Sequence, residues 1–421
     1  MPAPLRPLGR REDSLHHGLP PFTAQMSVPT DRTTPATSTE VPRSRRVVRA
    51  RLLLLLAGTV AGLLIVEAGL RLAGYRPAYA NVFRSFHQPH PLIGLHGRPH
   101  HAGRFRTGEI DAWTELDGRG FRRPAVQSPI ESSQRRIVLL GDSFAWGWGV
   151  GQGEVISDRI SLLRPSWHVE NLGLSATGPL QQLRLFEEYA GDLIGAGDVL
   201  LYLFFWNDFS DNVDGRDGSL LHARVDAAGR LELVEPELES GSTVKEWLRQ
   251  HSAVFNLLLF HSNRLKGEVR AGASAPRFGS ARATDEDLAA MRGALEALEE
   301  AASRRGAELV VAIVPAPTDL GLEETVPGDA ADARALRRDL ERILADVGAR
   351  SVDLLPAFRA ARDRSPAQRL YYRLDRHWTA VAHRVAARAI VEAIEAGDGV
   401  AAEEEAEWRP GSGEALPASD S

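Results

Sequence analysis

The stretch Ile137-Val-Leu-Leu-Gly-Asp-Ser-Phe-Ala-Trp-Gly-Trp-Gly149 decides the fold of this chain and points to its chemistry. Its apolar first half has the composition of a buried β-strand, which ends abruptly at Gly141-Asp142-Ser143 before a Gly-rich loop. Open α/β sheets bind their ligands at the carboxyl ends of the strands. Ser143 is therefore a candidate nucleophile, although a short Gly-Asp-Ser cluster on its own is typical of a simple turn.

From residue 135 onward, predicted strands and helices alternate. Strands are predicted over residues 136–140, 168–172, 199–205, 309–314 and 351–354. Helices are predicted over residues 154–163, 179–190, 285–304, 331–347 and 379–396. The near-continuous apolar run Val199-Leu-Leu-Tyr-Leu-Phe-Phe205 indicates a strand buried on both faces, as in a parallel sheet covered by helices. The sequence therefore predicts a three-layer α/β/α sandwich around a parallel five-stranded sheet.

Three more short motifs follow the first along the chain: Asn171-Leu-Gly173, Asn207-Asp208 and Asp375-Arg-His377. Together with Gly-Asp-Ser, and in this order, they resemble the four blocks of the SGNH, or GDSL, hydrolase superfamily. The resemblance covers roughly residues 135–395 as one catalytic domain. It implies a flavodoxin-like α/β fold and a serine esterase.

The resemblance assigns a catalytic triad to Ser143, His377 and Asp375. A serine hydroxyl at neutral pH needs a nearby base to take its proton, and His377 lies in a loop immediately before the last predicted helix. Asp375 is placed to hold the imidazole in the right tautomer. The resemblance also implies three oxyanion donors: the Ser143 N–H, the Gly173 N–H and the Asn207 side-chain amide. We expect Asp142 to fix the nucleophile loop by hydrogen bonds rather than to act in catalysis.

Two departures from the family pattern bear on the function. Phe205 stands two residues before Asn207, where the family usually has Gly, and it predicts a bulky pocket wall. Asp375 precedes His377 by two residues instead of three, a spacing that resembles cell-envelope polysaccharide O-acetyltransferases and their esterase relatives.

We therefore expect a serine-dependent ester hydrolase that acts on O-acetyl or other short acyl esters, with an envelope carbohydrate as the acylated substrate. A polysaccharide O-acetyltransferase with the same triad is the first alternative, because water or a sugar can resolve the same acyl-serine. A non-catalytic glycan-binding protein is the second, motivated by the bulk of Phe205.

Other ligand motifs fit poorly. The glycines after Ser143 lack the G-x-G-x-x-G spacing of a dinucleotide site and the Gly-Lys-Ser/Thr of a P-loop, so no cofactor is expected. Trp146 and Trp148 are equally compatible with stacking on a sugar ring and with packing. Five histidines lie between residues 75 and 130, but their spacing matches no metal motif, so no metal site is expected. They are His87, His90, His96, His100 and His101.

Composition narrows the function classes further. The 421 residues carry a formal net charge of −6, which gives no reason to expect a nucleic-acid partner. The chain contains no cysteine, so disulfides, thiolate catalysis and Cys-ligated metal sites are excluded.

The segment over residues 52–70 is almost entirely apolar and close in length to the roughly 20 residues that span a bilayer as a helix. An arginine cluster precedes it, which favours a cytoplasmic N-terminus and a catalytic domain on the periplasmic or extracellular side of the cell membrane. A cleaved signal peptide is the alternative, with small residues suited to cleavage at Val66-Glu-Ala68 and Ala78-Tyr-Ala80. We favour the retained anchor because the basic arm is longer than a typical signal n-region.

The predicted organisation has five parts. They are a disordered cytoplasmic arm over 1–42, a transmembrane anchor over 43–74, a linker that packs on the domain over 75–134, the hydrolase domain over 135–397, and a disordered acidic tail over 398–421. Residues 209–283 interrupt the alternation, with a short hairpin expected around Ala227-Ala-Gly229. Because this insertion follows the third strand, it is either a lid over the active site or a spacer without substrate contact.

Overall fold

The computed structural model describes most of the chain between residues 43 and 397. The described residues are 43–73, 85–107, 109–213, 219–226, 231–237, 244, 248, 252–255, 257–258, 262, 283–322 and 329–397. The predicted disordered arm over 1–42 and the predicted acidic tail over 398–421 lie outside them. Two units, residues 1–62 and 63–421, are described separately below.

Helix α1, Arg43–Leu72, contains the apolar segment predicted over residues 52–70. Within the part of the chain that the structure describes, one helical segment is long and apolar enough to cross a membrane. It runs over Val47–Leu72, 26 residues with a mean hydropathy of 2.2. Its leucine side chains are exposed, apart from that of Leu70, which is half-buried.

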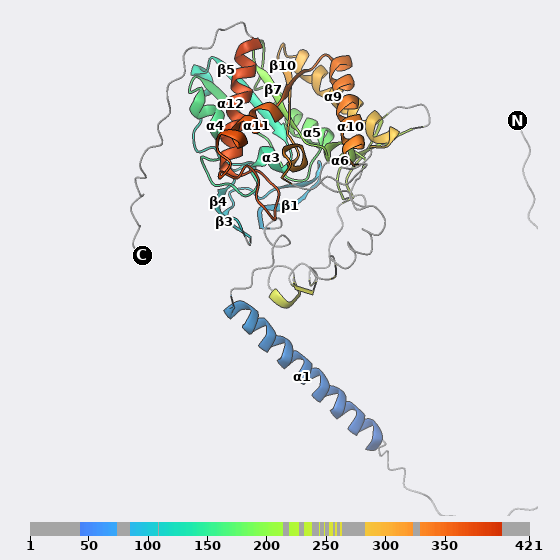
Figure 1. The fold of residues 1–421 in the computed structure, drawn as a ribbon. Helices are drawn as coiled ribbons and strands as arrows, with labels where there is room; N and C mark the ends of the chain where they lie inside the picture. The colour runs from blue at the N-terminus through green and yellow to red at the C-terminus, as the bar shows by residue number, and fades with distance from the viewer. Residues whose placement is uncertain are drawn as a thin grey trace, which may run out of the picture. The chain divides into compact units, whose positions relative to one another are not determined.

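A five-stranded parallel sheet forms the centre of the second unit (Figure 1). Its strands are β5 (Arg135–Gly141), β6 (Trp167–Asn171), β7 (Val199–Phe204), β10 (Glu308–Ile313) and β11 (Arg350–Asp353). They are ordered β11-β10-β7-β5-β6, which is the flavodoxin-like order 2-1-3-4-5 when the strands are numbered along the chain. The predicted fold class is confirmed.

The central strand β7 shows why this part of the sequence forms the middle of a sheet. All six of its residues are buried, as the continuous apolar run predicts for a strand with helices on both faces. Leu201 pairs with Leu139 of β5 on one side and with Val310 of β10 on the other.

Helices cover both faces of this sheet (Figure 1). One layer contains α4 (Ile156–Leu163), α11 (Leu355–Arg364) and α12 (Ala380–Gly397). The other contains α5 (Pro179–Tyr189), α9 (Asp285–Ser303) and α10 (Asp329–Val347). Helix α9 begins with a capping box, in which the Thr284 hydroxyl accepts from the Asp287 N–H while the Asp287 carboxylate accepts from the Thr284 N–H.

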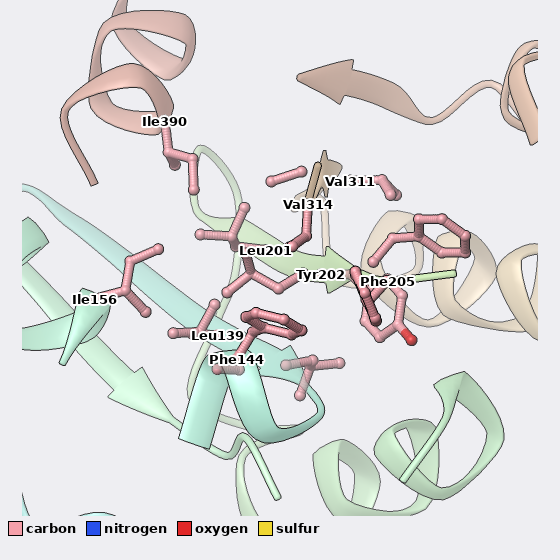
Figure 2. Close-up of a cluster of buried hydrophobic side chains, with 14 of the residues drawn as sticks. Leu139, Phe144, Ile156, Leu201, Tyr202, Phe205, Val311, Val314 and Ile390 are labelled. Carbon is pink, nitrogen blue, oxygen red and sulfur yellow. The ribbon is translucent and has the colours of Figure 1, made fainter. Parts of the chain in front are cut away.

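Apolar side chains from the sheet and from both helix layers form one continuous core. Figure 2 shows its centre, where Leu139 and Leu201 of adjacent strands lie near Ile156 of α4 and Ile390 of α12. Phe144 and Phe205, which follow β5 and β7, extend this core to the carboxyl edge of the sheet. Residues beside the candidate nucleophile are therefore part of the core.

The region predicted as a linker before the sheet forms two small antiparallel hairpins, which the sequence analysis did not anticipate. Strand β1 (His87–His90) pairs with β2 (Gly94–Gly97), and β3 (Ala102–Arg106) pairs with β4 (Asp111–Glu115). The strands have four or five residues each, too short for a clear alternating pattern. Six of the region's side chains belong to the main core: Phe86, Ile93, Phe105, Ile110, Leu116 and Phe121. We call residues 85–123 the N-terminal hairpins.

Parts of the predicted insertion over 209–283 are described. The short helix α6 (Asp208–Asp211) follows β7, and β8 (His222–Val225) pairs with β9 (Leu231–Val234). This pair confirms the hairpin predicted around residues 227–229, although the connecting residues themselves lie outside the described part. Two more short helical turns complete the described fold: η1 (Ile130–Ser132) and η2 (Pro317–Leu320).

Candidate active site

The candidate site lies at the carboxyl edge of the sheet, where the strand order reverses between β5 and β7. Ser143 directly follows β5, and Asn207 follows β7. Loops from two neighbouring parallel strands diverge at such a switch point, and the resulting crevice is the usual ligand site of open α/β sheets. The topology therefore brings the two predicted site residues to the same edge.

The backbone around Ser143 is set by its two neighbours. Gly141 has φ +140°, and a Cβ there would lie 2.9 Å from the Leu203 carbonyl oxygen, so only glycine fits. The Asp142 carboxylate accepts from the Phe144 N–H at 2.9 Å, which caps the one-turn helix α3 (Ser143–Trp146). This contact confirms that Asp142 fixes the nucleophile loop.

The structure brings Ser143, His377 and Asp375 together into one hydrogen-bonded chain. The Ser143 Oγ lies 2.7 Å from the His377 Nε2, and the His377 Nδ1 lies 2.5 Å from the Asp375 Oδ1. An ionised Asp375 requires the proton on Nδ1, which leaves Nε2 to accept from the serine hydroxyl. Asp375 and His377 are 4% and 8% exposed, whereas Ser143 is half-buried and accessible.

Aromatic rings enclose the imidazole. Phe144 and Trp148 lie with their ring centroids 5.2 Å and 5.4 Å from that of His377. The Trp148 indole N–H donates to the Asp375 Oδ2 at 3.1 Å, so the carboxylate is held at both oxygens. Trp146 and Trp148 are 0% and 4% exposed, which removes the sugar-stacking alternative and leaves packing as their role.

Phe205 does not form the bulky pocket wall expected from the sequence. Its side chain is 1% exposed and packs on Phe144, with ring centroids 4.7 Å apart. Since Phe144 in turn contacts His377, Phe205 supports the site from within the core (Figure 2). Alternation of side chains along the strand determines this direction, which the residue type alone does not reveal.

Gly173 does not present its N–H to the site as predicted. That N–H donates to the Asn171 Oδ1 at 2.8 Å, and this is an Asx-turn that the Asn-x-Gly sequence already contains. The glycine is needed for packing, because a Cβ there would lie 2.6 Å from the Ala145 Cβ. The Asn171 side chain also donates to the Ala145 carbonyl at 2.9 Å. The Asn-x-Gly motif thus fastens the end of β6 to α3.

Ala176 has an unusual backbone conformation for which the sequence gives no signal. It has φ +68°, a left-handed conformation that costs a non-glycine residue on the order of 1–3 kcal/mol and often marks a functional site. Residues 171–180 are otherwise buried, and Ala176 alone among them is half-exposed. The Leu174 N–H bonds the Gly141 carbonyl at 3.0 Å, so this loop is tied to the nucleophile loop. An alanine gives no sequence signal for such a backbone, unlike glycine or asparagine.

The Asn207 side chain forms hydrogen bonds within a group of carboxylates that follow β5 and β7. Its Nδ2 donates to the Asp211 Oδ2 at 2.6 Å. Asp208 is fully buried and accepts from the Tyr202 hydroxyl at 2.7 Å and from the Phe205 N–H at 2.9 Å. Burial and the nearby Asp142 raise the pKa of Asp208 well above its usual range.

Burial also raises the pKa of Asp142, to about 6, against the hydrogen bond from the Phe144 N–H, the positive potential of His377 and a hydrogen bond with Asn207. Asp142 is 3% exposed, so little water reaches this carboxyl group. The base of the nucleophile loop is therefore a place where a proton is bound more tightly in the folded protein than in the unfolded chain.

The histidines of the N-terminal hairpins serve in packing. His87 lies against Trp146 with ring centroids 5.3 Å apart, and His96 packs on Phe121 at 4.8 Å. Burial lowers the pKa of His96 to about 4, so this ring is neutral at physiological pH. Among the described residues, no group of three or more His, Cys, Asp or Glu side chains is arranged to hold a metal ion.

Comparison with known proteins gives one family match. The model of the SGNH hydrolase-like domain of acetyltransferase AlgX matches residues 277–418. The matched stretch contains Asp375 and His377, whereas Ser143 precedes it. None of the curated proteins matches the chain.

Solved structures with a similar fold include a member of the lipolytic G-D-S-L family from Veillonella parvula, with 12% sequence identity over 61% of this chain and 97% of that one and a TM-score of 0.35. The acetylxylan esterase Axe2 from Geobacillus stearothermophilus is 14% identical over 62% of this chain and 95% of its own, with a TM-score of 0.33. Likeness at these identities and TM-scores carries no weight for the activity of this chain.

Proposed function

We propose that the chain is a serine-dependent ester hydrolase acting on O-acetyl or other short acyl esters of an envelope carbohydrate, in keeping with the SGNH hydrolase-like family model that matches residues 277–418. The observation that carries this proposal is the hydrogen-bonded chain from the Ser143 Oγ through His377 to Asp375, with distances of 2.7 Å and 2.5 Å. A base within hydrogen-bond reach of a nucleophile, itself oriented by a carboxylate, is the arrangement that acyl transfer to serine requires.

The reaction follows from this geometry in two halves. The Ser143 Oγ attacks the acyl carbonyl carbon while the His377 Nε2 takes the hydroxyl proton, and the C–O bond to the sugar then breaks as His377 protonates the leaving sugar hydroxyl. Water next attacks the acyl-serine with His377 again as the base. The carboxylic acid leaves and the proton returns to Ser143. Asp375 stays ionised and stabilises the imidazolium in both halves.

The oxyanion that forms at each attack needs hydrogen-bond donors. We assign the Ser143 N–H at the start of α3 and the Asn207 amide, which exchanges a hydrogen bond to Asp211 or Asp142 for one to the oxyanion. The Ala176 N–H takes the place first given to Gly173, because the Gly173 N–H is already bound to Asn171. The left-handed backbone of Ala176, on a half-exposed residue beside the nucleophile loop, supports this third assignment.

Hydrolysis of an aryl acetate by the purified full-length chain tests the proposal. Ser143→Ala should lower kcat by a factor on the order of 10⁴ or more, because no other group supplies the nucleophile. Ser303→Ala, at the exposed end of α9, serves as the matched control and should leave kcat unchanged. Equal turnover by wild type and Ser143→Ala would exclude a serine esterase.

An O-acetyltransferase is the second candidate, and one observation favours it. The matching family model is described as a domain of an acetyltransferase, and its matched stretch includes the Asp-x-His spacing of Asp375 and His377. In that reaction a polysaccharide hydroxyl, instead of water, attacks the acyl-serine. Incubation of the acyl-labelled enzyme with a glycan distinguishes the two: label in free acetate supports hydrolysis, and label on the glycan supports transfer.

The non-catalytic glycan-binding alternative was motivated by a pocket narrowed by Phe205. This motivation no longer holds, because Phe205 is buried in the core and does not narrow the site. An active-site phosphonate tests this alternative directly. Stoichiometric labelling of Ser143 would exclude it, and glycan binding without labelling would support it.

We also propose that α1 anchors the protein in the cell membrane, with its N-terminus in the cytoplasm. The length and hydropathy of Val47–Leu72 and the arginines before it support this topology. Some reporter enzymes are active only after export. Such a reporter should be active when it is fused after residue 397. Reporter activity in the cytoplasm would contradict the orientation, and a soluble form that starts near Gly69 or Asn81 would establish a cleaved signal peptide.

A further inference from the structure

The turn of the β3–β4 hairpin binds the loop that carries two members of the triad. The Glu109 Oε2 accepts from the Arg373 N–H at 3.0 Å, and the Oε1 accepts from the Leu374 and Asp375 N–H groups at 2.6 Å and 2.5 Å. We propose that Glu109 is a positioning residue that fixes the Tyr372–His377 loop and thereby the triad. This inference rests on the proposed function, because it assigns Glu109 a role in that reaction.

The conformation of the loop explains why it needs an anion at this place. The Tyr372 N–H bonds the His377 carbonyl at 2.9 Å and the Arg376 N–H bonds the Tyr372 carbonyl at 3.1 Å, so the loop is a closed turn. Arg376 adopts φ +68° to complete it. This arrangement turns three successive N–H groups toward one point, and such a group of amides binds an anion. The Glu109 carboxylate occupies that point.

Glu109 is itself held in place by its surroundings. The Thr107 Oγ1 accepts from the Ile110 N–H at 3.2 Å, which shapes the turn. The neighbouring Ile110 side chain is 2% exposed and lies in the main core. A Cβ on Gly149 would meet the Ile110 Cδ1 at 2.9 Å, so the hairpin packs closely on the end of the nucleophile loop. The packing of Ile110 therefore positions Glu109 relative to the same segment that carries Ser143.

The contact acts on Asp375 at its backbone, while two other contacts hold its side chain. Glu109 binds the Asp375 N–H, Trp148 binds the Oδ2, and His377 binds the Oδ1. The Arg373 and Leu374 side chains are exposed, and Leu374 is 74% exposed, so packing does little to hold this part of the loop. Without Glu109 the backbone N–H groups would bond water, and the loop would sample positions in which His377 is displaced from Ser143. A displacement of about 1 Å can cost a catalytic group roughly 100-fold in rate.

The experiment compares three variants of the full-length chain in aryl acetate hydrolysis. Glu109→Ala removes both acceptor oxygens and with them all three hydrogen bonds, and it should lower kcat about 30- to 100-fold, with KM within about twofold of wild type. Glu109→Gln keeps one acceptor oxygen but places an amide donor against one N–H, so kcat should fall about 3- to 10-fold. Asp111→Asn is the matched control, because Asp111 lies on the same hairpin and pairs with Arg104 and Arg106 instead of the loop. Its kcat should stay within twofold of wild type.

A second readout separates positioning from mere stabilisation. The short hydrogen bond between the His377 Nδ1 and Asp375 should give a low-field proton resonance in wild type, identified by its loss in Asp375→Asn. In folded Glu109→Ala this resonance should be broadened or lost, and Glu109→Gln should restore it in part. A residue that only stabilises the fold would lower the melting temperature but leave the resonance and the kcat of the folded enzyme unchanged.

Each outcome is decisive. Wild-type kcat and an unchanged resonance in Glu109→Ala, with Ser143→Ala inactive, would overturn the role of Glu109 and leave the esterase assignment intact. Equal hydrolysis by wild type and Ser143→Ala would overturn the esterase assignment, and the resonance would still report whether Glu109 orders the Asp375–His377 pair. If Glu109→Ala does not fold, the kcat and resonance of Glu109→Gln decide the question, because wild-type values in that variant would overturn the proposal.

Discussion

The two loops that meet in the candidate site are held in different ways. The nucleophile loop, residues 141–149, is held by its own neighbours and by the end of the adjacent strand β6: the Asp142 carboxylate accepts from the Phe144 N–H, and the Asn171 amide donates to the Ala145 carbonyl. The acid–base loop, residues 372–377, depends on distant parts of the chain. Glu109 binds its backbone, and Trp148 binds its carboxylate.

This difference shows which contacts determine the geometry of the site. A loop held by local contacts forms whenever its strand and helix form, whereas a loop held by remote groups is positioned only in the complete fold. We therefore expect substitutions in the nucleophile loop to act on stability as well as on turnover. Substitutions in the supports of the acid–base loop should act mainly on turnover.

Asp375→Asn tests the acid–base loop most directly. An amide at this position favours the wrong imidazole tautomer, so kcat should fall by a factor on the order of 10⁴ while the fold is retained. Aryl acetate kinetics and the melting temperature measure the two effects. A kcat within tenfold of wild type would mean that the carboxylate of Asp375 is not the orienting group.

Asp142→Asn tests the nucleophile loop through its pH dependence. The pKa of Asp142 rises from 3.8 to about 6 on folding, so the folded protein keeps a proton that the unfolded chain releases. The stabilisation linked to this proton is present at low pH and is lost as the pH rises through about 6. Between pH 4.5 and 7.5, the loss of unfolding free energy should be smaller in Asp142→Asn than in wild type by about 2 kcal/mol.

Urea unfolding at the two pH values measures this difference. Asp363→Asn, in which an exposed carboxylate is removed, is the control and should behave like wild type. If Asp142→Asn loses as much stability as wild type over this range, the proton that wild type releases is not on Asp142.

Trp148→Phe tests the link between the two loops. Phenylalanine keeps an aromatic ring beside His377 but removes the N–H that holds the Asp375 Oδ2, so kcat should fall about tenfold with little change in KM. Trp113→Phe is a matched control, because the Trp113 ring is 52% exposed on β4. A larger fall in Trp113→Phe than in Trp148→Phe would contradict this role.

Ala176→Gly should have the smallest effect of these substitutions, and it should stabilise the protein. Glycine relieves the left-handed strain at φ +68° but loses more chain entropy on folding, so the free energy of unfolding should rise by about 0.5–1 kcal/mol. The same change at the exposed helical position Ala345 should lower it by about 1 kcal/mol. Denaturant unfolding of the two variants compares them, and a loss of stability in Ala176→Gly would contradict the presence of strain.

The same contrast explains what the sequence could predict. The strands of the sheet and most helices follow from hydrophobic patterns that are local, such as the run from Val199. The flavodoxin-like order was implied by the family resemblance, whose motif blocks also pointed to Ser143, Asp375 and His377. Glu109 gave no signal, because a lone glutamate in a turn looks like any surface residue, and its partners lie more than 260 residues away. Ala176 gave no signal either, because alanine does not indicate a left-handed backbone as glycine or asparagine does. The Gly173 N–H donates to the Asn171 side chain, an Asx-turn that the Asn-x-Gly spacing itself allows.

The long separation between the parts of the site also determines when they can work. Ser143 and His377 are 234 residues apart, and Glu109 and Leu374 are 265 residues apart. At synthesis rates of about 5–20 residues per second, roughly 10–50 s pass between the appearance of the serine and that of its base. A nascent chain, or one that ends before His377, would therefore carry an unactivated serine. Such a chain should not react with acyl groups until its last segment is released and the hydrogen bonds that hold residues 372–377 have formed.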